Sequence, residues 1–519
     1  MFSTVTAGAI SGIHSYLIQV EVDVSKGLPA FNIVGLPGAE AKESGQRVKV
    51  ALKNSGISLP PSHITINLSP ADIRKEGVSI DLPVAIGIML SLGEISDSAL
   101  DKTLVIGELG LDGEVRKING VLPIVKCAVE SGYTSCILPY ENAAEGALAG
   151  DIKIIGVKNL IECVSYLKEE KSLRDSLIKP TKVCVSDFFE NKANNYNVDF
   201  ADINGQSALK RAMEVVVAGF HHVLMVGSPG SGKSMIAKRI PTIMPPLEMD
   251  EALEVSTIYS VAGMLDSKNP LMIKRPFMSP HHSVTMSALA GGGRIPKPGV
   301  ISLSHRGVLF LDEIAEFSRS TLDLLRQPLE DKEVHIARVG GSFTYPANFM
   351  LVGAMNPCPC GYYPDRGKCR CTDKEIANYL SHISGPILDR IDICVDVPKV
   401  DFGDLSAKTS ANESSKTIME RVLKARAIQE ERFKNSSIRF NSEMSPKDIE
   451  KYCKLGTREK AMIEQLFYKM DLSARSYHRI LRVARTIADL DGSTDIKEMH
   501  IAEAACYKSN AGNYWNNAS

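Results

Sequence analysis

The stretch "GSPGSGKS", from Gly227 to Ser234, follows the apolar run "HVLMV" and precedes "MIAKRI", which has helical periodicity. It fits the pattern G-x-x-x-x-G-K-[ST] in the strand-to-helix context that a phosphate-binding P-loop requires. In such a loop the backbone N–H groups turn inward around the phosphates, and the helix N-terminus adds a favourable dipole. We predict an ATP site in which Lys233 neutralises phosphate charge and Ser234 ligates Mg²⁺. The residues of this site are Gly227, Ser228, Pro229, Gly230, Ser231, Gly232, Lys233 and Ser234.

A second apolar run, "GVLFLDE" from Gly307 to Glu313, supplies the other half of the predicted chemistry. Asp312, at the end of this strand, is expected to hold the Mg²⁺ shell, and Glu313 to polarise the attacking water. An Asp-Glu pair at a strand end is often only a solvated terminus. Its position about eighty residues after a P-loop favours the catalytic interpretation.

Four regions follow one another along the chain, and together they predict an α/β protein. Residues 1–170 alternate strands and helices, and residues 171–201 form a polar linker rich in Asn and Asp. Residues 202–400 contain near-continuous apolar strands, which suit a buried parallel sheet. Residues 401–519 have the amphipathic pattern of helices.

Composition narrows the class of protein without naming a partner. A length of 519 residues predicts two to four domains, and the longest apolar stretch, Leu82 to Leu90, is too short to span a bilayer. The N-terminus lacks a basic segment followed by an apolar run, so we expect a cytoplasmic protein with reduced cysteines and no membrane partner. Because the net charge is −1, any surface for nucleic acid must be a local patch.

The P-loop, "LFLDE", the strand-end Asn356 and "GPILDRID" together resemble AAA+ ATPases of the Mg-chelatase-like branch. From end to end the chain resembles the YifB/ComM family within that branch. The resemblance implies a Lon-protease-like α+β domain, then a P-loop AAA+ core with a parallel sheet, then a C-terminal helical lid domain. It also implies a ring, because the arginine finger of such an ATPase reaches the nucleotide of the neighbouring subunit.

Three further site residues come from this resemblance. Asn356 resembles the sensor of water or γ-phosphate, Arg390 the arginine finger, and Arg475 the second sensor on a lid helix. For Arg390 a simple surface ion pair with a flanking aspartate remains the alternative. Arg475, with three more arginines at helical spacing, also fits an ordinary solvated cationic face.

The resemblance to Lon raises the question of protease activity in residues 1–170. Ser79 falls at the position of the Lon nucleophile, but Leu122 occupies the position of the lysine base. Lys126 lies one helical turn further on, displaced by about 6 Å along the axis. We therefore expect an inactive domain that helps to assemble or gate the ring.

Two insertions typical of the Mg-chelatase-like branch interrupt the core. Residues 281–303 carry Arg294 and Lys297, and residues 333–346 carry Arg338 on a predicted hairpin with Gly340-Gly341 as its turn. In the resembled family such hairpins project into the ring pore. The three basic side chains are candidate phosphate contacts of DNA.

A third insertion, residues 357–372, contains Cys358, Cys360, Cys369 and Cys371 in the pattern C-x-C-x8-C-x-C. In a reducing compartment a disulfide framework is disfavoured, whereas four thiolates suit a structural tetrahedral Zn²⁺ site. Free thiols or a redox-sensitive pair remain the alternatives.

The resemblance to the YifB/ComM family implies an ATP-driven hexameric motor on branched or single-stranded DNA, a helicase that promotes branch migration in recombination or natural transformation. A Mg-chelatase-type motor subunit is the first alternative, and the Lon-like region argues against it. A Lon-like ATP-dependent protease is disfavoured by Leu122. A scaffold that only binds ATP is disfavoured by Asp312, Glu313 and Arg390.

Overall fold

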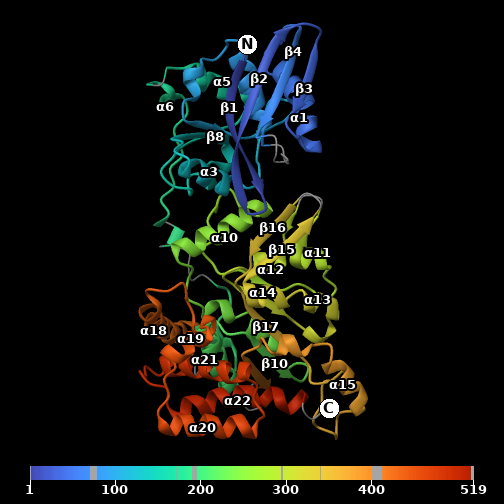
Figure 1. The fold of residues 1–519 in the computed structure, drawn as a ribbon, viewed down its shortest axis with the longest axis vertical. Coiled ribbons are helices and arrows are strands. Elements are labelled where there is room, and N and C mark those ends of the chain that lie inside the picture. The colour runs from blue at the N-terminus through green and yellow to red at the C-terminus, as the bar shows by residue number, and fades with distance from the viewer. Residues whose placement is uncertain are drawn as a thin grey trace.

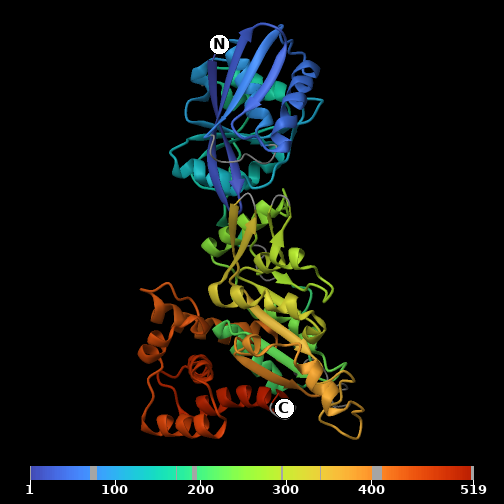
Figure 2. The ribbon, with the colours of Figure 1, turned by 45° about the vertical axis from the view of Figure 1, so that its right-hand side comes forward.

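The computed structural model describes residues 2–70, 79–170, 172–186, 188–189, 196–293, 296–338, 341–399 and 412–515. The N-terminal region lies at one end of the long axis of the molecule (Figure 1). The region with the P-loop, here called the middle region, extends from it to the other end, where the C-terminal helices lie beside it (Figure 2).

The N-terminal region is built on a seven-stranded sheet in the order β3-β4-β2-β1-β5-β8-β9. Strand β4 alternates buried and half-buried side chains, as expected when one face of a strand packs on a core. The apolar run from Leu82 to Leu90 forms helix α2, which is buried along its whole length. The strands are β1 (Phe2–Ser11), β2 (His14–Lys26), β3 (Ala30–Val34), β4 (Ser62–Ser69), β5 (Thr103–Val105), β8 (Ser135–Pro139) and β9 (Lys153–Val157). The main helices are α1 (Ala39–Asn54), α2 (Asp81–Ser91), α3 (Val121–Glu130) and α5 (Leu160–Lys168).

The predicted linker does not begin cleanly at residue 171. Helix α6 (Arg174–Leu177) follows α5, and the buried Arg174 donates to the carbonyl oxygens of Ala99 and Leu167. The amide of Thr181 donates to Ile154 of the sheet. The contacts of the N-terminal region therefore extend to Thr181. The sequence did not indicate these contacts, because the segment is polar in composition.

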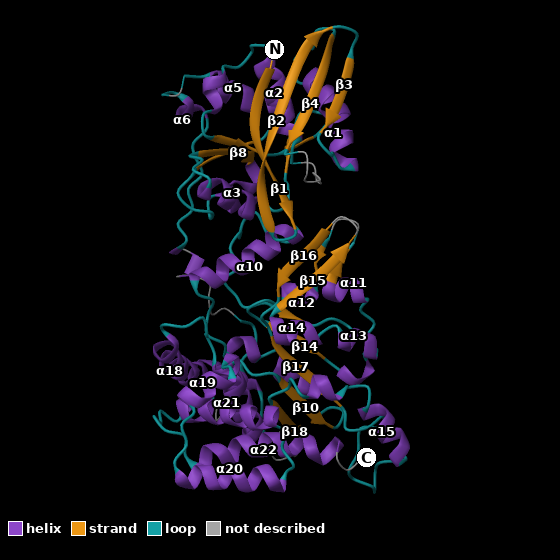
Figure 3. Cartoon of the chain, in the orientation of Figure 1, coloured by secondary structure: helices purple, strands orange, loops and turns teal. Residues whose placement is uncertain are grey.

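The middle region contains a five-stranded parallel sheet in the order β11-β14-β17-β10-β18. Its central strands are almost wholly buried, which fits a sheet covered on both faces by helices (Figure 3). The strands are β10 (Val223–Gly227), β11 (Phe277–Met278), β14 (Val308–Leu311), β17 (Met350–Met355) and β18 (Ile393–Val397). The helices include α8 (Ser207–Gly219), α9 (Lys233–Ala237), α10 (Met249–Ala262), α11 (Met286–Ala290), α12 (Val300–Leu303), α13 (Arg319–Asp323), α14 (Arg326–Asp331), α15 (Asp373–Leu380) and α16 (Gly385–Leu388).

The C-terminal region is helical, and its core is continuous with that of the middle region. One cluster of buried side chains joins Val216 of α8 and Val223 of β10 to Ile487 and Ile501 of the C-terminal helices. The predicted α/β class, parallel core sheet and helical C-terminal region are confirmed. The helices are α18 (Ser415–Phe433), α19 (Pro446–Tyr452), α20 (Thr457–Lys469), α21 (Ala474–Leu490) and α22 (Glu498–Trp515).

Helix α10 joins the N-terminal region to the middle region. Gly120 at the start of α3 donates its amide to Ser260 of α10, and Lys117 donates to the carbonyl of Leu265. The tip of the β1–β2 hairpin reaches the second insertion, because a methyl group at Gly12 would lie 3.3 Å from the ring of Phe343. The two regions are thus joined by polar and apolar contacts.

The second insertion forms the predicted hairpin, but its turn is one residue away from the expected position. Strands β15 (Glu333–Arg338) and β16 (Gly341–Pro346) pair so that Arg338 faces Gly341. Gly341 therefore lies in a strand, and the connecting residues 339–340 lie outside the described residues. The register is fixed by the apolar cross-strand pair of Ile336 and Phe343, which outweighs the preference of Gly-Gly for a turn. Lys297 is exposed in β13 (Lys297–Pro298), whereas Arg294 lies outside the described residues.

Across the described ranges, every helix is too short or too polar to cross a membrane.

Candidate ATPase site

Three strand ends bring the predicted nucleotide residues to one edge of the core sheet. Gly227 ends β10, Asp312 follows β14, and Asn356 follows β17. These strands are neighbours and parallel, so their carboxyl ends meet at the same edge. This is the edge at which open α/β sheets bind ligands.

The P-loop has the backbone that its glycines allow. Gly230 and Gly232 have positive φ angles of 75° and 89°, which favour glycine. Gly227 is needed for a different reason, since a methyl group there would lie 2.4 Å from the carbonyl oxygen of Val397. Sequence alone identified the loop, and the structure adds the close approach to β18.

Lys233 lies at the centre of the site and is buried. Its ammonium donates to the carbonyl oxygens of Gly227 (2.7 Å) and Ser228 (3.0 Å), and Asn356 Oδ1 lies 3.3 Å away. Burial lowers the pKa of Lys233, and the nearby carboxylates of Asp312 and Glu313 oppose this shift. A phosphate group would supply the negative charge that a buried ammonium needs.

The two predicted Mg²⁺ ligands touch each other, since Ser234 Oγ donates to Asp312 Oδ2 at 2.6 Å. A hydroxyl and a carboxylate are hard oxygen donors, and together with the ammonium of Lys233 they fit Mg²⁺ and ATP. Glu313 is exposed beside them in a left-handed conformation (φ 50°), and its amide donates to Asp312 Oδ1.

Gln206 is a site residue that the sequence analysis missed. It precedes α8, and its Nε2 donates to the carbonyl oxygens of Ser231 (2.8 Å) and Pro398 (3.3 Å). It therefore ties the P-loop to the chain after β18. A lone glutamine before a helix carries no recognisable signal in the sequence. In the structure Gln206 has a left-handed backbone (φ 53°), as does the preceding Gly205 (φ 64°).

Arg390 and Arg475 both contact Glu330, and Arg390 lies at the amino-terminal ends of the sheet strands, whereas Lys233 lies at their carboxyl ends. Because β18 pairs in parallel with β10, Arg390 before β18 lies at the end remote from the P-loop, about 13 Å or more along the strands. Arg390 pairs with Glu330 of α14, and Nη2 of Arg475 lies 3.8 Å from the other oxygen of that carboxylate. Neither arginine is brought to the P-loop of its own chain.

The four cysteines of the third insertion form one cluster. Cys358 Sγ lies 3.4 Å from Cys360 Sγ and 3.7 Å from Cys369 Sγ, and all four sulfurs lie within 4.8 Å of one another. Four thiolates bound to one Zn²⁺ would be about 3.8 Å apart, given a Zn–S distance of about 2.3 Å. The sulfurs therefore fit a tetrahedral Zn²⁺ site. Burial raises the pKa of the Cys360 thiol, but hydrogen bonds from the amides of Tyr362 and Arg370 outweigh it and lower the pKa to about 6. Burial raises the pKa of the Cys369 and Cys371 thiols, so the case for a metal rests on the positions of the sulfurs.

The cysteine insertion also contacts the P-loop. Gly361 lies so close to Pro229 that a methyl group there would be 2.4 Å from Cδ of the proline. A pocket of about 730 Å³ lies beside this contact. Its lining includes Ser228, Tyr362, Tyr363, Lys399 and Tyr514.

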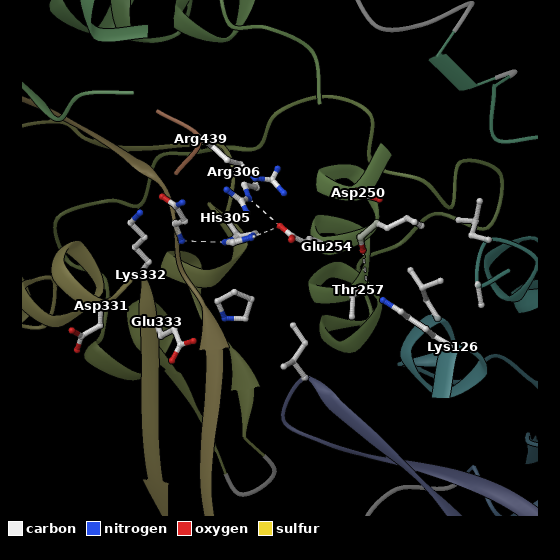
Figure 4. A pocket seen from close by; sticks show the side chains of 17 residues that line it. Lys126, Asp250, Glu254, Thr257, His305, Arg306, Asp331, Lys332, Glu333 and Arg439 are labelled. Atoms are coloured by element: carbon white, nitrogen blue, oxygen red, sulfur yellow. Dashed lines mark hydrogen bonds and ion pairs between the residues drawn. The ribbon is translucent and has the colours of Figure 1, made fainter. Parts of the chain in front are cut away.

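The candidate protease residues of the N-terminal region are not assembled. Ser79 Oγ donates to the carbonyl of Gly8 at 3.0 Å. Leu122 is buried in a cluster shared with α10 of the middle region. Lys126 lines a cleft of about 710 Å³ between the two regions, where it is directed toward α10 beside Thr257 (Figure 4). Ser79 does not line this cleft, so the structure gives no Ser–Lys pair among these residues.

The sequence of the middle and C-terminal regions matches known families. Residues 199–405 match the model described as Magnesium chelatase, subunit ChlI, and residues 412–508 match the model for the C-terminal part of that subunit. The chain is 40% identical to Competence protein ComM of Haemophilus influenzae over 96% of both chains. It is also 40% identical to the protein named YifB of Escherichia coli, over 98% of this chain and 97% of that one.

The chain belongs to the YifB/ComM family of Mg-chelatase-like AAA+ proteins. The family predicted from the P-loop and its companion motifs is thus confirmed. By contrast, the 67 kDa Magnesium-chelatase subunit of Heliobacterium mobile is 26% identical over only 44% of this chain and 38% of its own. Residues 20–142 match a further model described as subunit ChlI of Mg-chelatase. The N-terminal region by itself therefore does not separate this family from chelatase subunits, contrary to our argument from the sequence.

Proposed function

We propose that this YifB/ComM-family protein is an ATPase that works as a ring on DNA. The observation that carries the proposal is the division of its predicted catalytic groups between two edges of the core sheet. Lys233 and Asp312 lie at one edge, and Arg390 lies at the other. A second subunit that presents its Arg390 edge to the first completes the site, and repetition of this contact closes a ring.

The finer proposal is a hexamer in the cytoplasm that promotes branch migration in homologous recombination or natural transformation. The printed name of one relative, Competence protein ComM, supports the connection with competence. Candidate DNA contacts are Lys297 and Arg338, which lie on neighbouring hairpins of the middle region and are exposed.

ATP hydrolysis measured without DNA, with linear DNA and with a four-way junction tests this function, together with strand displacement. We expect hydrolysis to rise with DNA, most with the junction, and strand displacement to require ATP. Variants Lys297→Ala and Arg338→Ala should reduce DNA stimulation while leaving hydrolysis without DNA unchanged. Hydrolysis indifferent to every DNA would contradict the proposal.

A chelatase-type motor is the second candidate, since the family models that match the chain carry Mg-chelatase descriptions. Such a motor would hydrolyse ATP without DNA stimulation, so the same assay separates the two. A Lon-like protease is disfavoured because Ser79 and Lys126 are not paired in the structure. A casein digestion assay with Ser79→Ala as control should detect no cleavage by either protein.

We also propose that the cysteine cluster binds one structural Zn²⁺. The sulfur separations of 3.4–3.7 Å support this, because they suit a tetrahedral metal site. Four protein ligands leave no open position, so the metal would hold the insertion in shape without taking part in catalysis. Metal analysis of protein purified without added zinc should find about one equivalent per chain. Four freely titratable thiols and no metal would contradict it.

A further inference from the structure

One carboxylate contacts two arginines that come from different regions of the chain. Glu330 lies in the last turn of helix α14 of the middle region. One of its oxygens pairs with Nη2 of Arg390, and the other lies 3.8 Å from Nη2 of Arg475, at the start of α21 in the C-terminal region. Arg390 is also held by the carbonyl oxygen of Pro386 at 2.7 Å.

The surroundings of this carboxylate are strongly cationic. Arg479 lies one helical turn after Arg475, and its guanidinium is 3.8 Å from Asp389, the neighbour of Arg390. Two guanidinium groups brought close together repel each other, and a carboxylate between them offsets that repulsion. Glu330 thus places a negative charge between an arginine of the core and an arginine of the lid.

A purely structural role for Glu330 is disfavoured by exposure. The side chains of Glu330 and Arg475 are 55% and 60% exposed, and exposed ion pairs contribute little to stability. Such a pair can instead fix the orientation of its side chains, because long charged side chains otherwise sample many rotamers. The same exposure leaves Arg475 accessible to an incoming phosphate, whereas the side chain of Arg390 beside it is 17% exposed.

We propose that Glu330 is a positioning residue for ATP hydrolysis at the neighbouring subunit's site. It holds Arg390 and Arg475 together so that both meet the γ-phosphate of ATP bound to the next subunit. The inference rests on the proposed ATPase ring and adds to it one carboxylate that couples the core arginine to the lid arginine.

Steady-state ATP hydrolysis by Glu330→Ala is the first test. We expect kcat to fall roughly tenfold, because misplaced catalytic groups lose rate even when they remain present. KM for ATP should stay within about twofold, since the P-loop that binds the nucleotide belongs to the other subunit. Glu330→Gln should lie between, because it keeps a hydrogen-bond acceptor but loses the charge. Asp331→Ala, on the next residue, which is also exposed, is the matched control and should be unchanged.

A double-mutant comparison separates positioning from an independent effect. In an Arg390→Ala, Arg475→Ala background, Glu330→Ala should cause no further fall in kcat, because the groups through which it acts are gone. A further fall would overturn the proposal. A rise in kcat for Glu330→Ala in the wild-type background would also overturn it, since that result means that the carboxylate restrains the arginines instead of presenting them.

Mixed rings test whether Glu330 acts across the interface. Glu330→Ala subunits have an intact P-loop side, and Glu313→Gln subunits have an intact arginine side. A mixture should hydrolyse more ATP than the sum of the separate variants, because some interfaces combine the two intact sides. No gain in rings that contain both variants overturns the inference. If the wild-type protein hydrolyses no ATP, the proposed function itself fails. If the wild type hydrolyses ATP and Glu330→Ala hydrolyses it at the same rate, only this inference fails.

Discussion

Gly361 of the cysteine insertion packs directly on Pro229 of the P-loop, with room for no side chain between them. Pro229 and Gly361, more than a hundred positions apart in the sequence, thus lie in contact beside the predicted ATP site. The insertion leaves the sheet after Asn356, the predicted phosphate sensor, and returns to the P-loop, whose Lys233 lies 3.3 Å from Asn356 Oδ1. The four-cysteine cluster lies in the part of the chain that makes this return.

Gly361→Ala should weaken ATP binding. The added methyl group would lie 2.4 Å from Pro229 Cδ, and the φ angle of 81° strains any side chain, so the P-loop or the insertion must move. We expect Kd for ATP to rise by about tenfold, which corresponds to about 1.4 kcal/mol. Fluorescent nucleotide titration measures this. Gly367→Ala in the same insertion is the control, because its nearest neighbour is the end of the Asp365 side chain, which can shift. Equal ATP affinity in all three proteins would show that the contact is incidental.

Ser234→Ala should raise the Mg²⁺ requirement of hydrolysis. Ser234 Oγ is 2.6 Å from Asp312, so its loss removes one oxygen donor from a two-residue metal site. The Mg²⁺ concentration for half-maximal hydrolysis should rise at least about tenfold, the scale seen for loss of metal-site partners. Nucleotide binding without Mg²⁺ should be unaffected, because Lys233 and the backbone amides remain. If hydrolysis and Mg²⁺-free nucleotide binding were lost together, Ser234 would be needed for the structure of the P-loop and not for metal binding.

The pH dependence of stability should contain a contribution from His222. Its Nδ1 accepts a hydrogen bond from the amide of Leu351 at 3.1 Å, so the ring must be unprotonated there. Burial lowers the pKa of His222 from 6.5 to about 4, and the opposing influence of Asp392 does not offset it. Between these values the unfolded chain binds a proton that the folded protein does not. Stability is therefore lost as pH falls through this window, by about 2 kcal/mol between pH 6.5 and pH 4.5.

Thermal unfolding of wild type and His222→Asn at several pH values between 4.5 and 7.5 measures this contribution. The variant should be less stable at pH 7.5 but lose less stability on acidification, since the titrating group is gone. His14→Asn, an exposed histidine of the N-terminal region, is the control and should follow the wild type. Identical pH slopes for all three proteins would assign the acid sensitivity to other groups.

The sequence predicted those parts of the site that local chemistry specifies. The P-loop and Asp312 were found because phosphate and Mg²⁺ demand fixed residue types at fixed spacing beside a strand. Gln206 and Glu330 were missed because the residues that each contacts are distant in the sequence, which leaves no local pattern. The turn at Gly341 was placed one residue away because cross-strand pairing, which a single strand does not reveal, decides the register.

Removal of one cysteine should affect both the metal and the nucleotide. Cys369 is buried within the cluster, 3.7 Å from Cys358 Sγ and 3.6 Å from Cys360 Sγ, so Cys369→Ser leaves only three thiolates. Zinc content should fall from about one equivalent toward zero. Because the insertion that carries Gly361 then loses its fixed shape, Kd for ATP should also rise. Cys184→Ser, at an exposed cysteine outside the cluster, should change neither quantity. Zinc loss with unchanged ATP affinity would mean that Gly361 rests on Pro229 without supporting it.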